Sequence, residues 1–174
     1  MRALRRGLTV AAVVGLLVSL LPSHVTAAEK RWAPPTGGCW TVKPEERGFA
    51  ERINVARRIA GRSTLRLDDQ LSRSARKHTW EMVRANSLHH TPSTTLRRRV
   101  TNWVVLGENV GVGSEVDTLH RAFMDSPLHR DNVLYSTFRH VGVGTVRRDG
   151  RLWVTVLFEA ETNPGTTLMM PACG

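Results

Sequence analysis

The chain has 174 residues, of which 41% are hydrophobic, and a formal net charge of +10. It is long enough for one domain with a real core, and beyond an apolar segment near its start no stretch is apolar enough for a membrane helix. The charge favours an anionic surface as a partner. No basic cluster has the interleaved aromatic residues of a base-stacking surface, however, so we do not expect nucleic acid as a partner.

Residues 1–27 have the pattern of an export signal. Arg2, Arg5 and Arg6 form a basic start, and the apolar run that follows is too short to span a bilayer comfortably. Small residues at positions 25–27 then allow cleavage after Ala27. We therefore expect a secreted, extracellular protein with no transmembrane segment after signal cleavage.

Residues 28–43 are rich in Pro and Gly and predict an irregular lead-in. The chain has two cysteines, Cys39 and Cys173, one near each end of the expected mature protein. In an oxidising compartment we expect them to form a structural disulfide that ties back the tail at residues 161–174. Two free thiols are the alternative.

The domain proper is predicted at residues 44–160 and begins with two helices. The first starts at Pro44 and ends near Gly61; the second follows a short extended connection and is capped by Asp68. The residues expected to face the core are Phe49, Ile53, Ala56 and Ala60 in the first helix, and Leu71, Ala75, His78 and Met82 in the second.

A loop is predicted at residues 86–103, followed by an apolar run with interspersed glycines at residues 104–113. Ser114 and Asp117 resemble the capping box of a further helix. Its expected buried side consists of Val116, Leu119, Ala122 and Phe123. Ser126 and Pro127 suit the N-cap and first position of a short helix that carries His129.

The end of the domain is predicted to be β structure. Residues 140–146 and 151–159 flank a turn in which Asp149-Gly150 indicates a tight hairpin. Because the helices come first in the chain and an antiparallel hairpin comes last, the sequence predicts an α+β domain in which helices cover a small sheet.

Three polar residues at the edges of these elements are candidates for chemistry: His90, Glu108 and His129. A carboxylate in the apolar run needs a compensating partner, which two histidines could supply. The dipole of the short helix disfavours a charged His129, and a neutral imidazole accepts protons or binds metals. Two histidines and a carboxylate are also a ligand set of catalytic zinc, so Zn²⁺ or another divalent metal is a candidate cofactor.

Each candidate has a structural alternative. Histidines in loops and caps are usually satisfied by hydrogen bonds, and Glu108 could hold a backbone turn, as Asn109 beside it suggests. Ser126 and His129 are spaced like a nucleophile and its base, but a capping hydroxyl is committed to backbone N–H groups. We expect His78 to be packed and His89 to be an exposed neighbour of His90. We expect a place at the core edge or surface for His120, His140, Trp103 and Trp153.

Four segments in order resemble the bacterial branch of the CAP superfamily. They are His-Thr-Pro at 90–92, Gly-Glu-Asn at 107–109, Ser-Pro-Leu-His-Arg-Asp-Asn at 126–132 and Gly-Val-Gly at 142–144. That superfamily of SCP domains includes cysteine-rich secretory proteins, antigen five and pathogenesis-related proteins. The resemblance spans residues 44–160 and implies an α-β-α sandwich with a central cleft lined by two histidines and two acids.

The resemblance assigns His90, Glu108 and His129 to this cleft. The second acid departs from the pattern, because Ser126 stands at the glutamate position of the Trp-x-x-Glu motif of animal and plant members, with Asp125 one residue away. The departure weakens the case for metal chemistry that needs all four residues. The candidate catalytic residues are therefore His90, Glu108, His129, Asp125 and Ser126.

The superfamily implies binding of lipids or divalent metal, or action on cell-wall or protein targets. One hypothesis is a secreted binding module whose cleft holds a small hydrophobic or envelope ligand, that is a lipid, a cell-wall fragment or a peptide. The alternative is a zinc-dependent hydrolase, a protease or a cell-wall enzyme, that uses His90, Glu108 and His129. A third hypothesis is contact of the basic surface with anionic envelope polymers.

Overall fold

The structure, a computed structural model, describes residues 40–161. The predicted export signal, its cleavage site and the Cys39–Cys173 pair lie outside these residues. Within the described residues, no helix is long and apolar enough to cross a membrane.

Residues 40–161 contain five helices and four strands. The helices are α1 (Pro44–Ile59), α2 (Asp69–Ala85), α3 (Ser93–Arg99), α4 (Val116–Asp125) and α5 (Pro127–Leu134). The strands are β1 (Arg66–Leu67), β2 (Trp103–Gly113), β3 (His140–Arg148) and β4 (Arg151–Glu161). They form one sheet in the order β1-β3-β4-β2. The predicted α+β class is confirmed, but the sheet is mixed because the short β1 pairs in parallel with β3.

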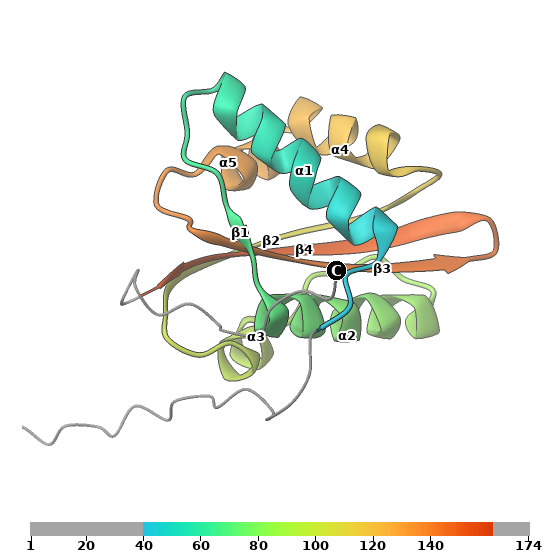
Figure 1. Ribbon diagram of the computed structural model, residues 1–174. Helices are drawn as coiled ribbons and strands as arrows, with labels where there is room; N and C mark the ends of the chain where they lie inside the picture. Colours follow the sequence, from blue (N-terminus) through green and yellow to red (C-terminus); the bar gives the residue numbers. More distant parts are fainter. Residues whose placement is uncertain (1–39, 162–174) are drawn as a thin grey trace, which may run out of the picture. The chain divides into compact units, whose positions relative to one another are not determined.

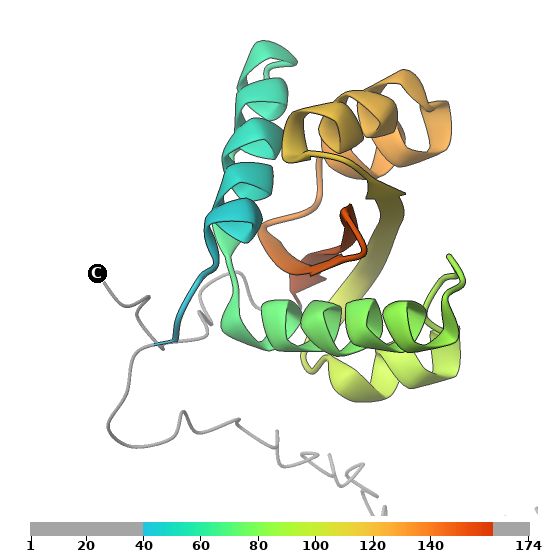
Figure 2. The same cartoon turned by 90° about the vertical axis from the view of Figure 1, so that its right-hand side faces the viewer.

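The sheet lies between two helical layers, with α1, α4 and α5 on one face and α2 and α3 on the other (Figures 1 and 2). Side chains alternate between these faces along each strand. On β4, Val154, Val156 and Phe158 belong to the main core under α1 and α4. Leu157 instead packs with Leu71 of α2.

Two glycines of β3 allow α2 to lie directly on the sheet. A Cβ atom at Gly142 would be 2.2 Å from the Cβ of Leu71, and one at Gly144 would be 2.2 Å from the backbone nitrogen of Arg76. The hydroxyl of Thr79 also donates to the carbonyl of Gly144 at 2.9 Å. The position of α2, and of the loop that follows it, is therefore fixed closely relative to the strands.

Several local predictions are confirmed. The carboxylate of Asp68 caps α2 by accepting from the backbone N–H of Leu71 at 2.8 Å. Gly61 follows α1 with a φ of 65°, a conformation that favours glycine. Asp149 and Gly150 both have positive φ, as the predicted tight hairpin between β3 and β4 requires.

Other local predictions are wrong. The predicted loop at 86–103 contains α3, which the buried side chain of Leu96 anchors. Residues 104–113, for which no helix or strand was predicted, belong to strand β2, whose glycines provide room for neighbouring side chains. Ser114 forms no capping box because Glu115 is the N-cap of α4. Ala60 and Ala122, predicted to face the core, are exposed.

Arg57 of α1 is a charged residue in the interior of the domain. Its side chain is fully buried. Its guanidinium donates to the carbonyls of Ser63 at 2.7 Å, Val133 at 2.8 Å and Tyr135 at 2.9 Å. Arg57 therefore joins the end of α1 to the segment between α5 and β3.

Candidate functional site

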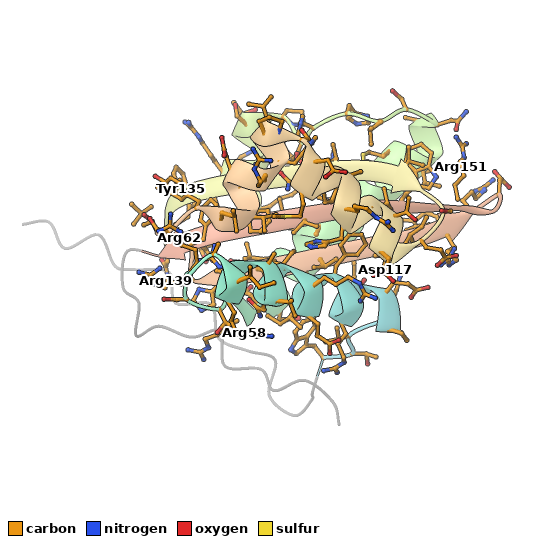
Figure 3. All side chains as sticks on the ribbon, turned by 90° about the horizontal axis from the view of Figure 1, so that it is seen from above. Arg58, Arg62, Asp117, Tyr135, Arg139 and Arg151 are labelled. Atoms are coloured by element: carbon orange, nitrogen blue, oxygen red, sulfur yellow. The ribbon has the colours of Figure 1, made fainter. Side chains whose placement is uncertain are left out.

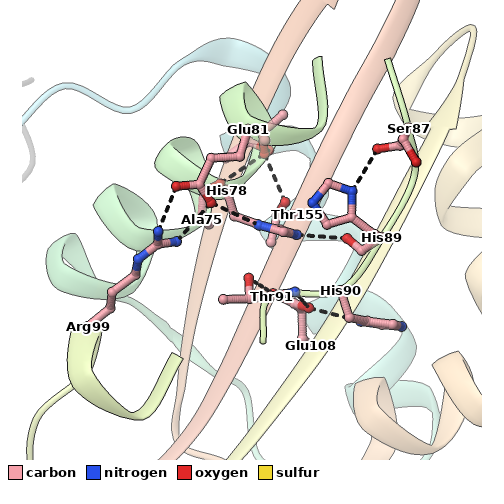
Figure 4. Close-up of polar contacts among 12 residues, drawn as sticks. Ala75, His78, Glu81, Ser87, His89, His90, Thr91, Arg99, Glu108 and Thr155 are labelled. Atoms are coloured by element: carbon pink, nitrogen blue, oxygen red, sulfur yellow. Dashed lines mark hydrogen bonds and ion pairs between the residues drawn. The ribbon is translucent and has the colours of Figure 1, made fainter. Parts of the chain in front are cut away.

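Glu108 lies in the middle of β2, and its side chain is only 7% exposed. Oε1 accepts a hydrogen bond from the backbone N–H of Thr91 at 2.8 Å and contacts Nδ1 of His90 at 2.9 Å (Figure 4). Oε2 accepts from the hydroxyl of Thr91 at 2.6 Å. Both a histidine and a backbone N–H group therefore compensate the buried carboxylate. The interpretation with histidine partners holds for His90, and the interpretation with a backbone partner holds for the N–H of Thr91.

His90 is the solvent-facing member of this cluster, with a side chain that is 61% exposed. A carboxylate at Nδ1 requires Nδ1 to carry a proton, so a neutral His90 presents the lone pair of Nε2. No group of residues 40–161 forms a hydrogen bond with that Nε2. The imidazole can therefore accept a hydrogen bond from a molecule in solution.

A second network, on α2 and α3, holds the loop that carries His90. As predicted, His78 is packed, and its Nε2 donates to the carbonyl of His89 at 2.8 Å (Figure 4). Nδ1 of His78 lies 3.3 Å from Oε2 of Glu81. Oε1 of the same carboxylate accepts a hydrogen bond from Arg99 at 2.7 Å. Burial raises the pKa of Glu81, but the hydrogen bonds from Arg99 and His78 outweigh it and keep that pKa below its usual value.

His129 lies in the first turn of α5, at a separate part of the site. Its Nδ1 is 2.9 Å from the hydroxyl oxygen of Ser126, and its ring packs on Phe123 at 5.1 Å between centroids. Burial and the nearby charge of His90 lower the pKa of His129 below its usual value. Ser126 is the predicted N-cap, but its side chain does not cap the helix, so the predicted commitment of this hydroxyl to backbone N–H groups is wrong.

Two asparagines that the sequence interpretation did not place in the site join α5 to β2. Asn109 donates to the carbonyl of His129 at 3.0 Å, and Asn132 donates to the carbonyl of Glu108 at 3.2 Å and to Oδ1 of Asn109 at 2.9 Å. Asn109 lies within a strand, so the suggested turn role is wrong. The sequence signal that could have identified Asn132 was the Ser-Pro-Leu-His-Arg-Asp-Asn motif at 126–132, which contains both His129 and Asn132.

The alternation of β2 explains why Glu108 and His129 form no hydrogen bond with each other. Glu108 and Asn109 are neighbours in an edge strand, so their side chains point to opposite faces of the sheet. Glu108 contacts Thr91 of the loop after α2, whereas Asn109 contacts α5. The site consists of two pairs, His90–Glu108 and Ser126–His129, and the charge of His90 is close enough to lower the pKa of His129.

This arrangement does not fit the predicted metal ligand set. Within residues 40–161, no group of three or more His, Cys, Asp or Glu side chains is placed to hold a metal ion. Both oxygens of Glu108 already take part in hydrogen bonds. Asp125 is exposed at the end of α4, and in the described part of the chain no hydrogen bond or ion pair joins it to these residues.

The other expected histidines and tryptophans differ in burial. His140 and Trp153, predicted at the core edge or surface, are both buried, with 3% exposure each. His120 and Trp103 are partly buried, as predicted. His89 is exposed as predicted, although its ring also lies edge-on to His78 at 5.2 Å.

The family model described as "CAP: Cysteine-rich secretory protein family" matches residues 50–158, more than half of the chain. The chain belongs to this family. The match confirms the resemblance seen in the sequence motifs and makes the described residues a CAP domain.

A curated relative supports the family membership. The chain is 28% identical over 138 residues to the uncharacterized protein YkwD of Bacillus subtilis, a match that covers 75% of this chain. It covers 53% of that protein, so the chain spans about half the length of the curated relative it matches.

Two solved structures illustrate the likeness of this CAP domain to known proteins. An outer surface protein of Borrelia burgdorferi aligns with a TM-score of 0.64 and 20% identity over 72% of this chain and 99% of that one. An extracellular protein containing an SCP domain from Bacillus anthracis aligns with a TM-score of 0.58 and 23% identity over 70% of this chain and 45% of that one. These alignments show the shared fold.

Proposed function

We propose that this CAP domain is a secreted binding module and that its ligand contacts the surface around His90 and His129. The observation that carries the proposal is the His90–Glu108 pair. An imidazole that is 61% exposed is held by a carboxylate that is 7% exposed. Such a pair presents one oriented acceptor, Nε2, to solvent without a further rotamer search, which reduces the entropic cost of binding.

A hydroxyl or amide N–H of the ligand would donate to this acceptor. Lipids with a hydroxyl group, cell-wall sugars and peptides all carry such donors. All three predicted classes of ligand are therefore compatible with this acceptor. Secretion is supported by the predicted signal at residues 1–27 and by the extracellular relative from Bacillus anthracis.

Mass spectrometry of the natively exported protein tests the proposal. We expect a copurified small molecule in the wild type, its loss in His90→Ala, and its retention in His89→Ala. His89 is the matched control because it is the exposed neighbour of His90 and its ring contacts the carbonyl of Ser87 instead of Glu108. Retention of the molecule in His90→Ala at the wild-type level would contradict the proposal.

The Ser126–His129 pair supports a second candidate, a hydrolase that forms a covalent intermediate. The lowered pKa of His129 favours a neutral imidazole, whose Nδ1 at 2.9 Å can take the hydroxyl proton while the Ser126 oxygen attacks an acyl carbon. The imidazolium would return this proton to the leaving group as the bond between that group and the acyl carbon breaks, and water would then release the acyl group from Ser126. Labelling by a fluorophosphonate probe that disappears in Ser126→Ala would support this candidate. Absence of labelling in the folded wild type would exclude it.

The zinc-dependent hydrolase with His90, Glu108 and His129 stays a prediction. The described side chains do not supply a ready ligand cluster for it. Calorimetric titration of the purified protein with zinc tests it directly.

A further inference from the structure

A hollow of about 310 Å³ lies where the end of α2 meets the β3–β4 hairpin. Arg84 and Asn86 line it from the helical side. The hairpin side consists of Arg148, Asp149, Arg151 and Trp153. The hollow therefore brings together three guanidinium groups from two segments that are more than sixty residues apart in the chain.

The charges of this hollow are not balanced. Among the described residues that line it, Asp149 is the one acid, and its carboxylate lies 3.6 Å from Nε of Arg148. Arg151 has neutral partners, since it donates to Oδ1 of Asn86 at 3.2 Å and lies over the ring of Trp153 at 5.3 Å. In the described part of the chain, neither Arg84 nor Arg151 forms an ion pair with a carboxylate.

Capping of α2 does not account for these arginines. Cations near a helix C-terminus can stabilise it by interacting with its last carbonyl groups. At this end, however, the backbone N–H of Asn86 bonds to the carbonyls of Met82 and Val83, and that of Ser87 bonds to the carbonyl of Met82. The carbonyls of Met82 and Val83 thus have backbone partners, and among the described residues no guanidinium of the hollow donates to a carbonyl of α2. The guanidinium groups are therefore available to solutes.

We propose that this hollow binds an oxyanion, namely the phosphate or carboxylate group of a small ligand. The planar guanidinium group offers paired N–H donors that match the oxygens of both groups. Arg151 is already oriented by Asn86 and Trp153, so little of its freedom is lost on binding. The indole of Trp153 also lines the hollow and lies against the guanidinium of Arg151, which helps to fix the direction of that group.

This site is separate from the one around His90. On β4, Arg151 pairs with Arg148 at the hairpin, whereas Leu157 pairs with Glu108. The separation of six positions in the sequence corresponds to about 20 Å along a strand. Figure 3 shows Arg151 at the opposite end of the domain from Arg58, Arg62 and Arg139.

Titration of the purified full chain with inorganic phosphate and, separately, with glucuronate tests the proposal. The titrations use a phosphate-free buffer at constant ionic strength. We expect saturable binding of at least one probe, weakened tenfold or more in Arg151→Gln and in Arg84→Gln. Arg58→Gln is the matched control, because it removes one exposed arginine charge outside the hollow, and we expect less than a twofold change there.

The two probes separate the two sources of the oxyanion. Tighter binding of phosphate than of glucuronate would indicate a phosphorylated ligand. Tighter binding of glucuronate than of phosphate would indicate a carboxylated sugar. Equal weakening in Arg58→Gln and Arg151→Gln would show that only the general basic charge attracts anions and would overturn the proposal. Absence of saturable binding of both probes would also overturn it, with folding of each variant verified by circular dichroism.

Discussion

Thr91 binds both oxygens of the Glu108 carboxylate, through its backbone N–H at 2.8 Å and through its hydroxyl at 2.6 Å. The two residues lie on different elements, a loop after α2 and the edge strand β2. This pair of bonds fixes the loop to the strand at the residue next to His90. The position of the exposed imidazole thus depends on a threonine that carries no chemistry of its own.

Replacement of Glu108 by Gln tests this attachment. The amide oxygen can still accept from the N–H of Thr91 and the amide NH₂ can donate to its hydroxyl, but the negative charge that strengthens both bonds and the contact with His90 is lost. We expect the free energy of unfolding to fall by about 1–3 kcal/mol in urea denaturation. The control is Glu115→Gln, since the Glu115 side chain is 64% exposed in its ion pair with Arg147. Its expected change is within about 0.5 kcal/mol.

Replacement of Asn132 by Leu should loosen α5 from β2. The substitution removes the two donations to Glu108 and Asn109 and leaves both acceptor oxygens without this partner. We expect a loss of about 1–3 kcal/mol and faster amide hydrogen exchange in residues 127–134. Unchanged exchange in α5 would contradict this role of Asn132.

Replacement of Arg57 by Met tests the buried guanidinium. The variant retains an apolar stem but leaves the carbonyls of Ser63, Val133 and Tyr135 without their donor. We expect destabilisation of about 3 kcal/mol or more. Arg58→Met, at an exposed neighbouring position, is expected to change stability by about 0.5 kcal/mol or less. Equal effects in both variants would contradict the structural role of Arg57.

The stability of the domain should fall in acid partly because of His140. Burial and the charge of Arg66 lower the pKa of His140 from 6.5 to about 4. As the pH falls below 6.5, the unfolded chain therefore binds a proton at this residue before the folded chain does. His140 thus costs on the order of 3 kcal/mol of stability as the pH falls from 6.5 to the folded pKa.

His140→Asn removes this proton uptake. We expect the difference in unfolding free energy between wild type and variant to change across this pH range, as measured by urea denaturation at several pH values. His89→Asn controls for the loss of a histidine at an exposed position. A constant difference between wild type and His140→Asn from pH 7 to pH 4 would disprove the assignment.

The sequence predicted the parts of the fold that have strong local signals. The hairpin at Asp149-Gly150, the cap at Asp68 and the start of α5 at Pro127 each depend on one or two residues with a restricted backbone preference. Strand β2 was missed because its glycines at 107, 111 and 113 resemble turn residues. They serve instead to admit Phe138, Phe123 and Leu119 against the strand, and this contact is visible only in the tertiary structure.

The candidate site was predicted in part. His90 and Glu108 were expected to meet, and they do. Thr91 was missed because a threonine after two histidines carries no signal of its own. The Ser126–His129 contact was discounted on the general behaviour of N-cap residues, and the actual rotamer of Ser126 depends on the neighbouring ring. Such choices between hydrogen-bond partners cannot be decided from spacing alone.

The opposite orientation of Glu108 and Asn109 makes the site intolerant of length changes in β2. Deletion or insertion of a single residue between positions 105 and 113 would exchange the two faces of the strand. The carboxylate would then point to α5 and the amide to Thr91. Variation in chain length among relatives should therefore accumulate between Thr91 and the strand, and leave the segment from Val105 to Gly113 constant in length.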